Sequence, residues 1–303
     1  RNSAALVENR GTTCAFLISH QSRLRKGAQA CTRIESEFPG KVLNMSRKRA
    51  IDARESSDPK FIHWKSRFKA ATVAFEMGKL DEARTVIYRS LMEAESLKDK
   101  NFAVPVCHIG MAVVSMNQEK EREAKDYFEK AINALSGQPE ADTRELYGAA
   151  LRFYAHFYER KNDLSEAENC LRQSVAVLKE LGPESAAQLA YSLADLAAIM
   201  VRTGQLEEAD VLVKSSIEIL VATVGTDDPS CDWAKLIYQV CLNQNDREML
   251  ELVFEDSVTA MQYKLGARHP NLVRALNAYG TALRKRGLTE KLEHLKEKFS
   301  ALV

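Results

Sequence analysis

The sequence lacks the short motifs that mark the common catalytic and cofactor sites. It contains no Gly-rich phosphate loop, no HExxH pair and no GxSxG turn. The six cysteines form no CxxC, and the adjacent Cys107 and His108 have no second pair near them to complete a zinc-binding spacing. We therefore expect no cofactor, no metal site and no enzymatic activity.

The chain also lacks a long apolar run and a strong charge of either sign. No stretch reaches the length of a transmembrane helix, so we expect no membrane partner. The 43 Lys and Arg nearly balance the 42 Asp and Glu, and the net charge of +1 gives no bulk attraction to nucleic acid. Scattered cysteines without a disulfide framework suit a reducing compartment, so we expect a cytoplasmic protein.

No stretch shows the two-residue alternation of a β-strand. Instead, one short pattern recurs at nearly fixed spacing, at residues 78–83, 120–124, 162–167 and 204–209. Its copies end in Ala83, Ala124, Ala167 and Ala209, which are 41, 43 and 42 residues apart. Weaker copies follow at residues 245–250 and 287–292. A period in this range is typical of a stacked repeat array.

Each repeat reads as two helices joined by a tight turn. Between residues 186 and 201, for example, apolar residues recur at steps of three and four, as on one face of a helix. The sequence predicts an all-α, right-handed superhelical solenoid of about six antiparallel helix pairs. We place its units at about residues 61–98, 102–137, 143–182, 184–225, 229–266 and 269–303, within a repeat domain spanning residues 59–303.

This pattern resembles the tetratricopeptide repeat. The resemblance rests on the second-helix alanine followed four residues later by a large residue, as in Ala167 and Leu171, and on Tyr279-Gly280 in the last unit. Residues 266–277, with their Gly, His-Pro and Leu-Asn, are similar to the longer repeat of the kinesin light chain subtype. For Asn277, the resemblance implies a hydrogen bond to the main chain of a ligand.

Residues 1–58 differ from the remainder of the chain. They lack the repeat and carry 11 Lys and Arg against 6 Asp and Glu, whereas residues 59–303 carry 32 against 36. Met45 is the first methionine, so residues 1–44 read either as added or upstream-translated sequence or as a basic targeting segment for an organelle. Residues 1–58 are thus predicted to be a non-repeat segment outside the solenoid.

Stacked units of this kind line a concave face with their first helices. Counted from the repeat alanine, the first helices of units three to six should present mostly cations and amides there. The predicted partner-binding residues are Arg152, His156, Arg160, Arg202, Lys235, Asn243, Arg274, Asn277 and Arg284. The second unit offers apolar residues at the same positions, including Ile109 and Val113.

The leading hypothesis is a non-catalytic scaffold that binds a protein or peptide, specifically an acidic segment, in this groove. One alternative is an RNA-associated helical-repeat protein, supported by the basic residues 1–58. Another is an enzyme with a groove site around Arg152, His156 and Glu159. A clamp for the C-terminal carboxylate of a chaperone is not expected, because units three to five place Asp195 and Asp232 at two of the positions where that clamp has amides and cations.

Overall fold

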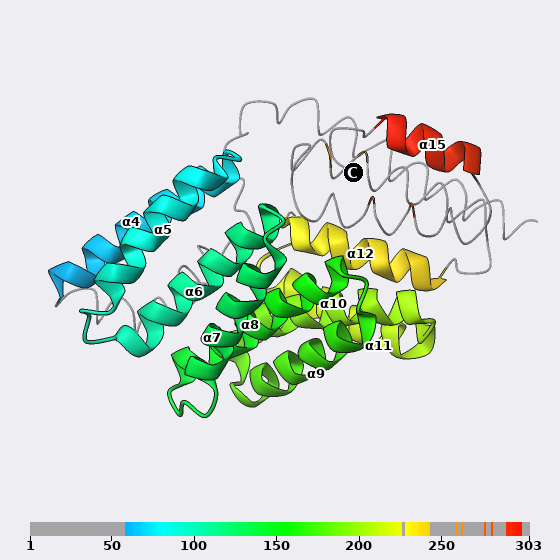
Figure 1. Cartoon of the computed structure of the whole chain (residues 1–303). Helices are drawn as coiled ribbons and strands as arrows, with labels where there is room; N and C mark the ends of the chain where they lie inside the picture. The colour runs from blue at the N-terminus through cyan, green and yellow to red at the C-terminus, as the bar shows by residue number, and fades with distance from the viewer. Residues whose placement is uncertain are drawn as a thin grey trace, which may run out of the picture. The chain divides into compact units, whose positions relative to one another are not determined.

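The computed structural model describes residues 58–225, 228–242, 259, 262, 276, 280 and 289–298. These residues form helices and no strand, which confirms the all-α prediction for this part of the chain (Figure 1). The helices are α4 (Pro59–Glu76), α5 (Leu80–Ala94), α6 (Lys100–Asn117), α7 (Glu121–Leu135), α8 (Ala141–Arg160), α9 (Leu164–Glu180), the short 3-10 helix η1 (Pro183–Ser185), α10 (Ala186–Thr203), α11 (Leu206–Thr223), α12 (Pro229–Leu242) and α15 (Thr289–Lys298).

The helices from α4 to α12 pack as pairs in the order of the sequence. Within units one to four, α4 packs on α5, α6 on α7, α8 on α9 and α10 on α11. Between units, each second helix packs on the following first helix, and α6, α8, α10 and α12 contact one another in succession. The first helices therefore lie side by side, so residues one repeat apart on them become neighbours.

The turn inside each pair has the same backbone geometry in all four units. Its central residue is Gly78, Glu119, Asn162 or Gly204, each with a positive φ between 58° and 89°. The residue after it donates its N–H to a carbonyl five positions back, as in Gln205 to Met200 at 2.8 Å. The glutamate in the second unit shows that this turn forms even where the sequence pattern is degenerate.

The repeat alanines are buried, as predicted. Ala83, Ala124, Ala167 and Ala209 are all fully buried. The large residues four positions later, Ile87, Phe128, Leu171 and Val213, are also buried. A small residue at the first position lets the helices approach, and the large residue then fills the space beyond it.

One serine hydrogen bond within unit three, and an equivalent one within unit four, hold the two helices of each unit close together. The Ser174 hydroxyl donates to the Gly148 carbonyl at 2.7 Å, and the Ser216 hydroxyl donates to the Ala190 carbonyl at the same distance. These serines occupy equivalent positions, seven residues after the repeat alanine. A Cβ at Gly148 would lie only 2.7 Å from the Leu178 side chain, so a larger residue there would force Leu178 to shift.

All described residues lie in residues 36–303, one of the two compact units into which the chain divides. Our division at residue 58 and the exact limits of the six units stay predictions. The second helix of unit five and most of unit six lie outside the described residues. Among the described helices, none is both long and apolar enough to cross a membrane.

Candidate functional site

Five of the nine predicted partner-binding residues lie in the described part of the chain. Arg152, His156 and Arg160 belong to α8, Arg202 to α10 and Lys235 to α12. The other four, Asn243, Arg274, Asn277 and Arg284, lie outside the described residues and stay predictions. The structure brings Arg152 and His156 together at one carboxylate. Arg160 and Lys235 are exposed.

Arg152 and His156 meet at one carboxylate on the neighbouring first helix. Arg152 Nη1 donates to Asp195 Oδ2 at 3.2 Å, and His156 Nε2 lies 2.8 Å from the same oxygen. All three side chains are buried. A charged guanidinium out of water requires such a partner, because an unpaired buried charge is strongly unfavourable.

Aromatic rings complete the surroundings of Arg152. Its Cζ lies 5.0 Å from the centre of the Phe153 ring and 5.5 Å from that of Tyr191, within the range of cation–π attraction. The Phe153 ring in turn lies edge-on to His156. The Nε–H of Arg152 is buried and has no hydrogen-bond acceptor within the described part of the chain.

Arg202 links the same two units at the other end of the helices. Its Nη1 donates to Glu159 at 3.1 Å and its Nη2 to Asn162 at 2.9 Å, where Asn162 is the central residue of the turn in unit three. Both pairs join residues 40 or 43 positions apart, close to one repeat period. Arg202 therefore helps to fix one unit against the next.

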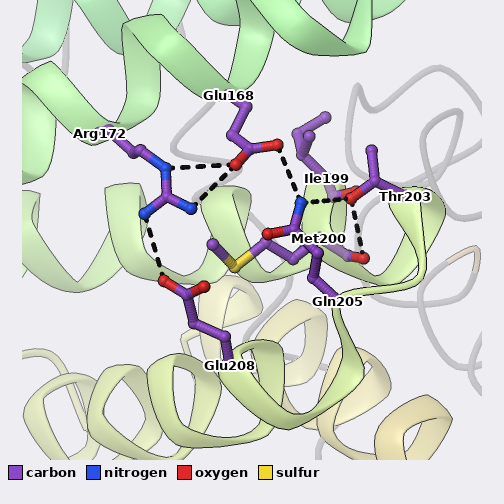
Figure 2. Close-up of polar contacts among 7 residues, drawn as sticks. All are labelled: Glu168, Arg172, Ile199, Met200, Thr203, Gln205 and Glu208. Carbon is purple, nitrogen blue, oxygen red and sulfur yellow. Dashed lines mark hydrogen bonds and ion pairs between the residues drawn. The ribbon is translucent and has the colours of Figure 1, made fainter.

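The neighbouring turn edge carries a polar network between the second helices, shown in Figure 2. Arg172 donates to Glu168 within α9 and to Glu208 on α11 at 3.2 Å. The Gln205 amide donates to the second Glu168 oxygen at 3.1 Å and to the Thr203 hydroxyl at 2.9 Å. This network links unit four to unit three, and its two acids, Glu168 and Glu208, outnumber its one arginine.

The same kind of link occurs between units one and two. Arg84 on α5 donates to both oxygens of Glu123 on α7, and this hydrogen bond is the main reason that the pKa of Glu123 lies below its ordinary value. Gln118 also donates to Asp81 at 2.8 Å. Charged pairs one repeat apart are thus a general device for stacking these units.

Much of the predicted first-helix face is buried in the folded chain. The buried positions include Ile109, Val113, Arg152, His156, Tyr191, Ala194 and Ala198. The exposed ones are Asn117 and Arg160, each at the C-terminal end of a first helix, together with Lys235 and Gln239 on α12. The accessible part of this face therefore lies along the ends of α6 and α8 and on α12.

The cysteines of the described helices are apolar packing residues. Cys107, Cys170, Cys231 and Cys241 are free and buried. Burial raises the pKa of Cys107 to about 12 and those of Cys170 and Cys241 to about 11. Such thiols are poor nucleophiles and poor metal ligands, because the thiolate is the reactive form. Within the described ranges, no three His, Cys, Asp or Glu side chains are grouped as a metal site would need.

Sequence reasoning found Arg152 and His156 but missed their pairing with Asp195. It considered Asp195 only as a residue that would repel a ligand carboxylate. A signal was present in the spacing, because Arg152 and Asp195 are 43 residues apart and so fall on adjacent first helices. Complementary charges one period apart would have predicted the pair.

A family model of the tetratricopeptide repeat matches residues 189–230, from within α10 through α11 to the start of α12. No curated protein matches the sequence. Several solved structures share the fold. A Rap protein complexed with competence and sporulation factor is 15% identical, with a TM-score of 0.65, over 81% of this chain and 64% of that one.

Two further structures extend this likeness. Aspartyl phosphate phosphatase F from Bacillus subtilis is 13% identical, with a TM-score of 0.64, over 80% of this chain and 60% of that one. The third is a structure of nearly identical repeats from a putative kinesin light chain of Podospora anserina. Its sequence is 19% identical to this one, with a TM-score of 0.50, over 66% of this chain and 95% of that one. At these identities the likeness concerns the fold. Together with the tetratricopeptide repeat matched at residues 189–230 and the four equivalent turns, it shows that the described helices have the fold of a tetratricopeptide-repeat solenoid.

Proposed function

We propose that this protein is a non-catalytic scaffold that binds a protein or peptide partner on its first-helix face. The observation that carries the proposal is the successive contact of α6, α8, α10 and α12. Helices that lie side by side present equivalent positions as one continuous face, and an extended or helical segment can follow such a face across several units.

The Rap protein of similar fold supports this function, since its structure is of a complex with competence and sporulation factor. Another protein of this fold is named as an aspartyl phosphate phosphatase. Neither name transfers an activity to this chain, because one fold serves many functions. On this chain, Asp195 Oδ2 lies 2.8 Å from His156 Nε2 and also accepts from Arg152.

We further propose that the partner contributes an acidic segment. Among the predicted positions that the structure describes, the exposed cations are Arg160 on α8 and Lys235 on α12. Arg202, half-buried beside Glu159, extends the same edge. Exposed cations steer an acidic ligand and set its orientation more than they set its final affinity. The predicted contributions of Asn243, Arg274, Asn277 and Arg284 belong to the same proposal.

The test is an unbiased pull-down that compares two double charge reversals. Arg160→Glu with Lys235→Glu alters the exposed cations of the first-helix face. Arg122→Glu with Lys130→Glu is the matched control, because both residues are exposed on α7, a second helix. We expect the first variant to lose proteins that the wild type and the control retain, and those proteins to carry acidic segments. Equal capture by both variants would refute the proposed face.

Reversal of Arg152 is a poor choice for this test. It would place a second carboxylate beside the buried Asp195, and like charges out of water destabilise the fold. An Arg152→Glu variant would therefore lose binding through partial unfolding, whatever its role. The exposed pair avoids this ambiguity, and thermal unfolding of both double variants should stay close to that of the wild type.

A further inference from the structure

The first helix of unit one, α4, exposes a row of residues that the later first helices bury. This α4 row, at steps of three and four along one side of the helix, consists of Ile62, Ser66, Ala70 and Val73. All four residues are exposed, and Ile62 and Val73 are 49% and 48% exposed. Their equivalents on α6, α8 and α10, counted from the repeat alanines, are all buried. The equivalents of Val73, for example, are Val114, Phe157 and Ile199, each 3% exposed or less.

In the later units, the preceding second helix covers this row. Tyr154 and Phe157 occupy the row on α8, and their ring centres lie 5.3 Å and 6.1 Å from that of Phe128 on α7. Each of the second helices α5, α7, α9 and α11 packs in this way on the first helix that follows it. The α4 row is exposed on the first helix that the structure describes. It therefore has the form of a seam that a second helix of a preceding unit would fill.

The charges of α4 are opposite to those of the helices that fill this seam elsewhere. α4 carries four Lys and Arg and one acid. The second helices α5, α7, α9 and α11 carry 3, 4, 3 and 4 acids against 2, 3, 2 and 1 Lys and Arg. Lys69, one turn before Val73, is exposed beside the row. An acidic helix thus complements α4, whereas a second copy of α4, or the basic residues 1–58, would bring like charges together.

We propose that the α4 row is a docking surface for an amphipathic helix with acidic flanks, contributed by another protein. The helix takes the place that a preceding second helix has in the later units, with its apolar side against Ile62 and Val73 and an acid beside Lys69. The small Ser66 and Ala70 between them let the helix approach closely. This inference goes beyond the proposed function, because the equivalents of the row are covered by second helices and are not part of the first-helix face.

Two other occupants of the row are separated first, with the full chain. Val73→Glu places a charge in the row, and Val211→Glu is the matched control, because Val211 is exposed on α11. We expect the wild type and both variants to share one oligomeric state in sedimentation equilibrium and one urea midpoint. An oligomer that only Val73→Glu dissociates would assign the row to a second copy. A loss of stability confined to Val73→Glu would assign it to residues of the same chain, and either result would overturn the proposal.

The docking helix is represented by a fluorescein-labelled peptide of residues 205–224, which spans α11, the most acidic of the second helices α5 to α11. Its binding is measured by fluorescence anisotropy. We expect saturable binding to the wild type and to Val211→Glu, and binding at least about tenfold weaker to Val73→Glu, because the new carboxylate is buried without a partner. Lys69→Glu should weaken binding by about two- to fivefold, the range for an exposed ion pair. Lys179→Glu, at an exposed lysine of α9, is its matched control and should bind as the wild type does.

Each of three results would overturn the proposal. The first is the absence of saturable binding to the wild type. The second is binding that Val73→Glu leaves unchanged, because the peptide would then occupy another surface. The third is equal binding to Lys69→Glu and Lys179→Glu, because the acidic flank would then have no role. None of these measurements involves the exposed cations of the first-helix face, so the docking surface and the proposed function can fail independently.

Discussion

The turn of the second unit places a glutamate where the first and fourth units have glycine. Glu119 has a φ of 60°, against 72° at Gly78 and 89° at Gly204, and all three occupy the same place in the repeat. Its side chain is exposed, and the chain after it closes through the same backbone bond, from Lys120 to Ser115 at 2.9 Å. Replacing Glu119 by glycine therefore changes the backbone preference and little else.

The expected effect follows from two opposing contributions. The left-handed conformation costs a residue with a Cβ about 1–2 kcal/mol. Glycine removes that cost, but its greater freedom in the unfolded chain takes back about 0.5–1 kcal/mol. Glu119→Gly should therefore stabilise the protein by about 0.5–1 kcal/mol. A Cβ at Gly204 would meet no atom within 4 Å, so sterics beyond the backbone add nothing in that equivalent turn.

Urea unfolding followed by circular dichroism measures this difference. Glu119→Ala is the matched control and should leave stability nearly unchanged, because alanine keeps the backbone strain while removing the carboxylate. Gly204→Ala is the reverse experiment and should destabilise by a similar amount. If Glu119→Gly is neutral or destabilising while Gly204→Ala is harmful, the second turn does not carry the strain inferred from its geometry.

Three further predictions concern the packed helices. Gly148→Ala should destabilise by about 1–2 kcal/mol in urea unfolding, because overpacking against Leu178 outweighs the helix preference of alanine, and it should become stabilising in a Leu178→Ala background. A harmful effect in both backgrounds would contradict the contact. Ser216→Ala should cost about 1 kcal/mol by the same assay through loss of its bond to the Ala190 carbonyl, and no cost would mean that water replaces that bond. Cys107, whose pKa is raised to about 12 by burial, should resist maleimide in the folded protein up to pH 8, where about one thiol in ten thousand is ionised, and rapid labelling detected by peptide mass spectrometry would refute its burial.

The helical repeat was predictable because its signals are local and recur. The alanine at each second helix, the large residue four positions later and the glycine of the turn all repeat at one period, so weak patterns reinforce one another. Ala83 and Ala209 confirm the result, since both are fully buried. Glu119 departs from the glycine of the pattern, yet the turn at this position has the same geometry as in the other units.

The candidate site was less predictable, because it depends on which residues oppose one another between units. The positions of Arg152 and His156 on a first helix followed from the repeat count, but their burial did not. Burial of a face depends on all that packs against it, which a period cannot show. The pairing with Asp195 was within reach of sequence reasoning, since the two helices were known to be neighbours. The exposure of Arg160 and Lys235 could not have been predicted in this way, because it depends on what packs around them.

The central claim is that the first helices, rather than the second, hold the partner. Hydrogen–deuterium exchange of this protein with and without a partner recovered by the pull-down tests it most directly. Our account predicts slower exchange in α8, α10 and α12, with most of the change near Arg160 and Lys235, and little change in α9 and α11. Protection confined to α9 and α11 would contradict the account, because the partner would then sit on the opposite face of the repeat.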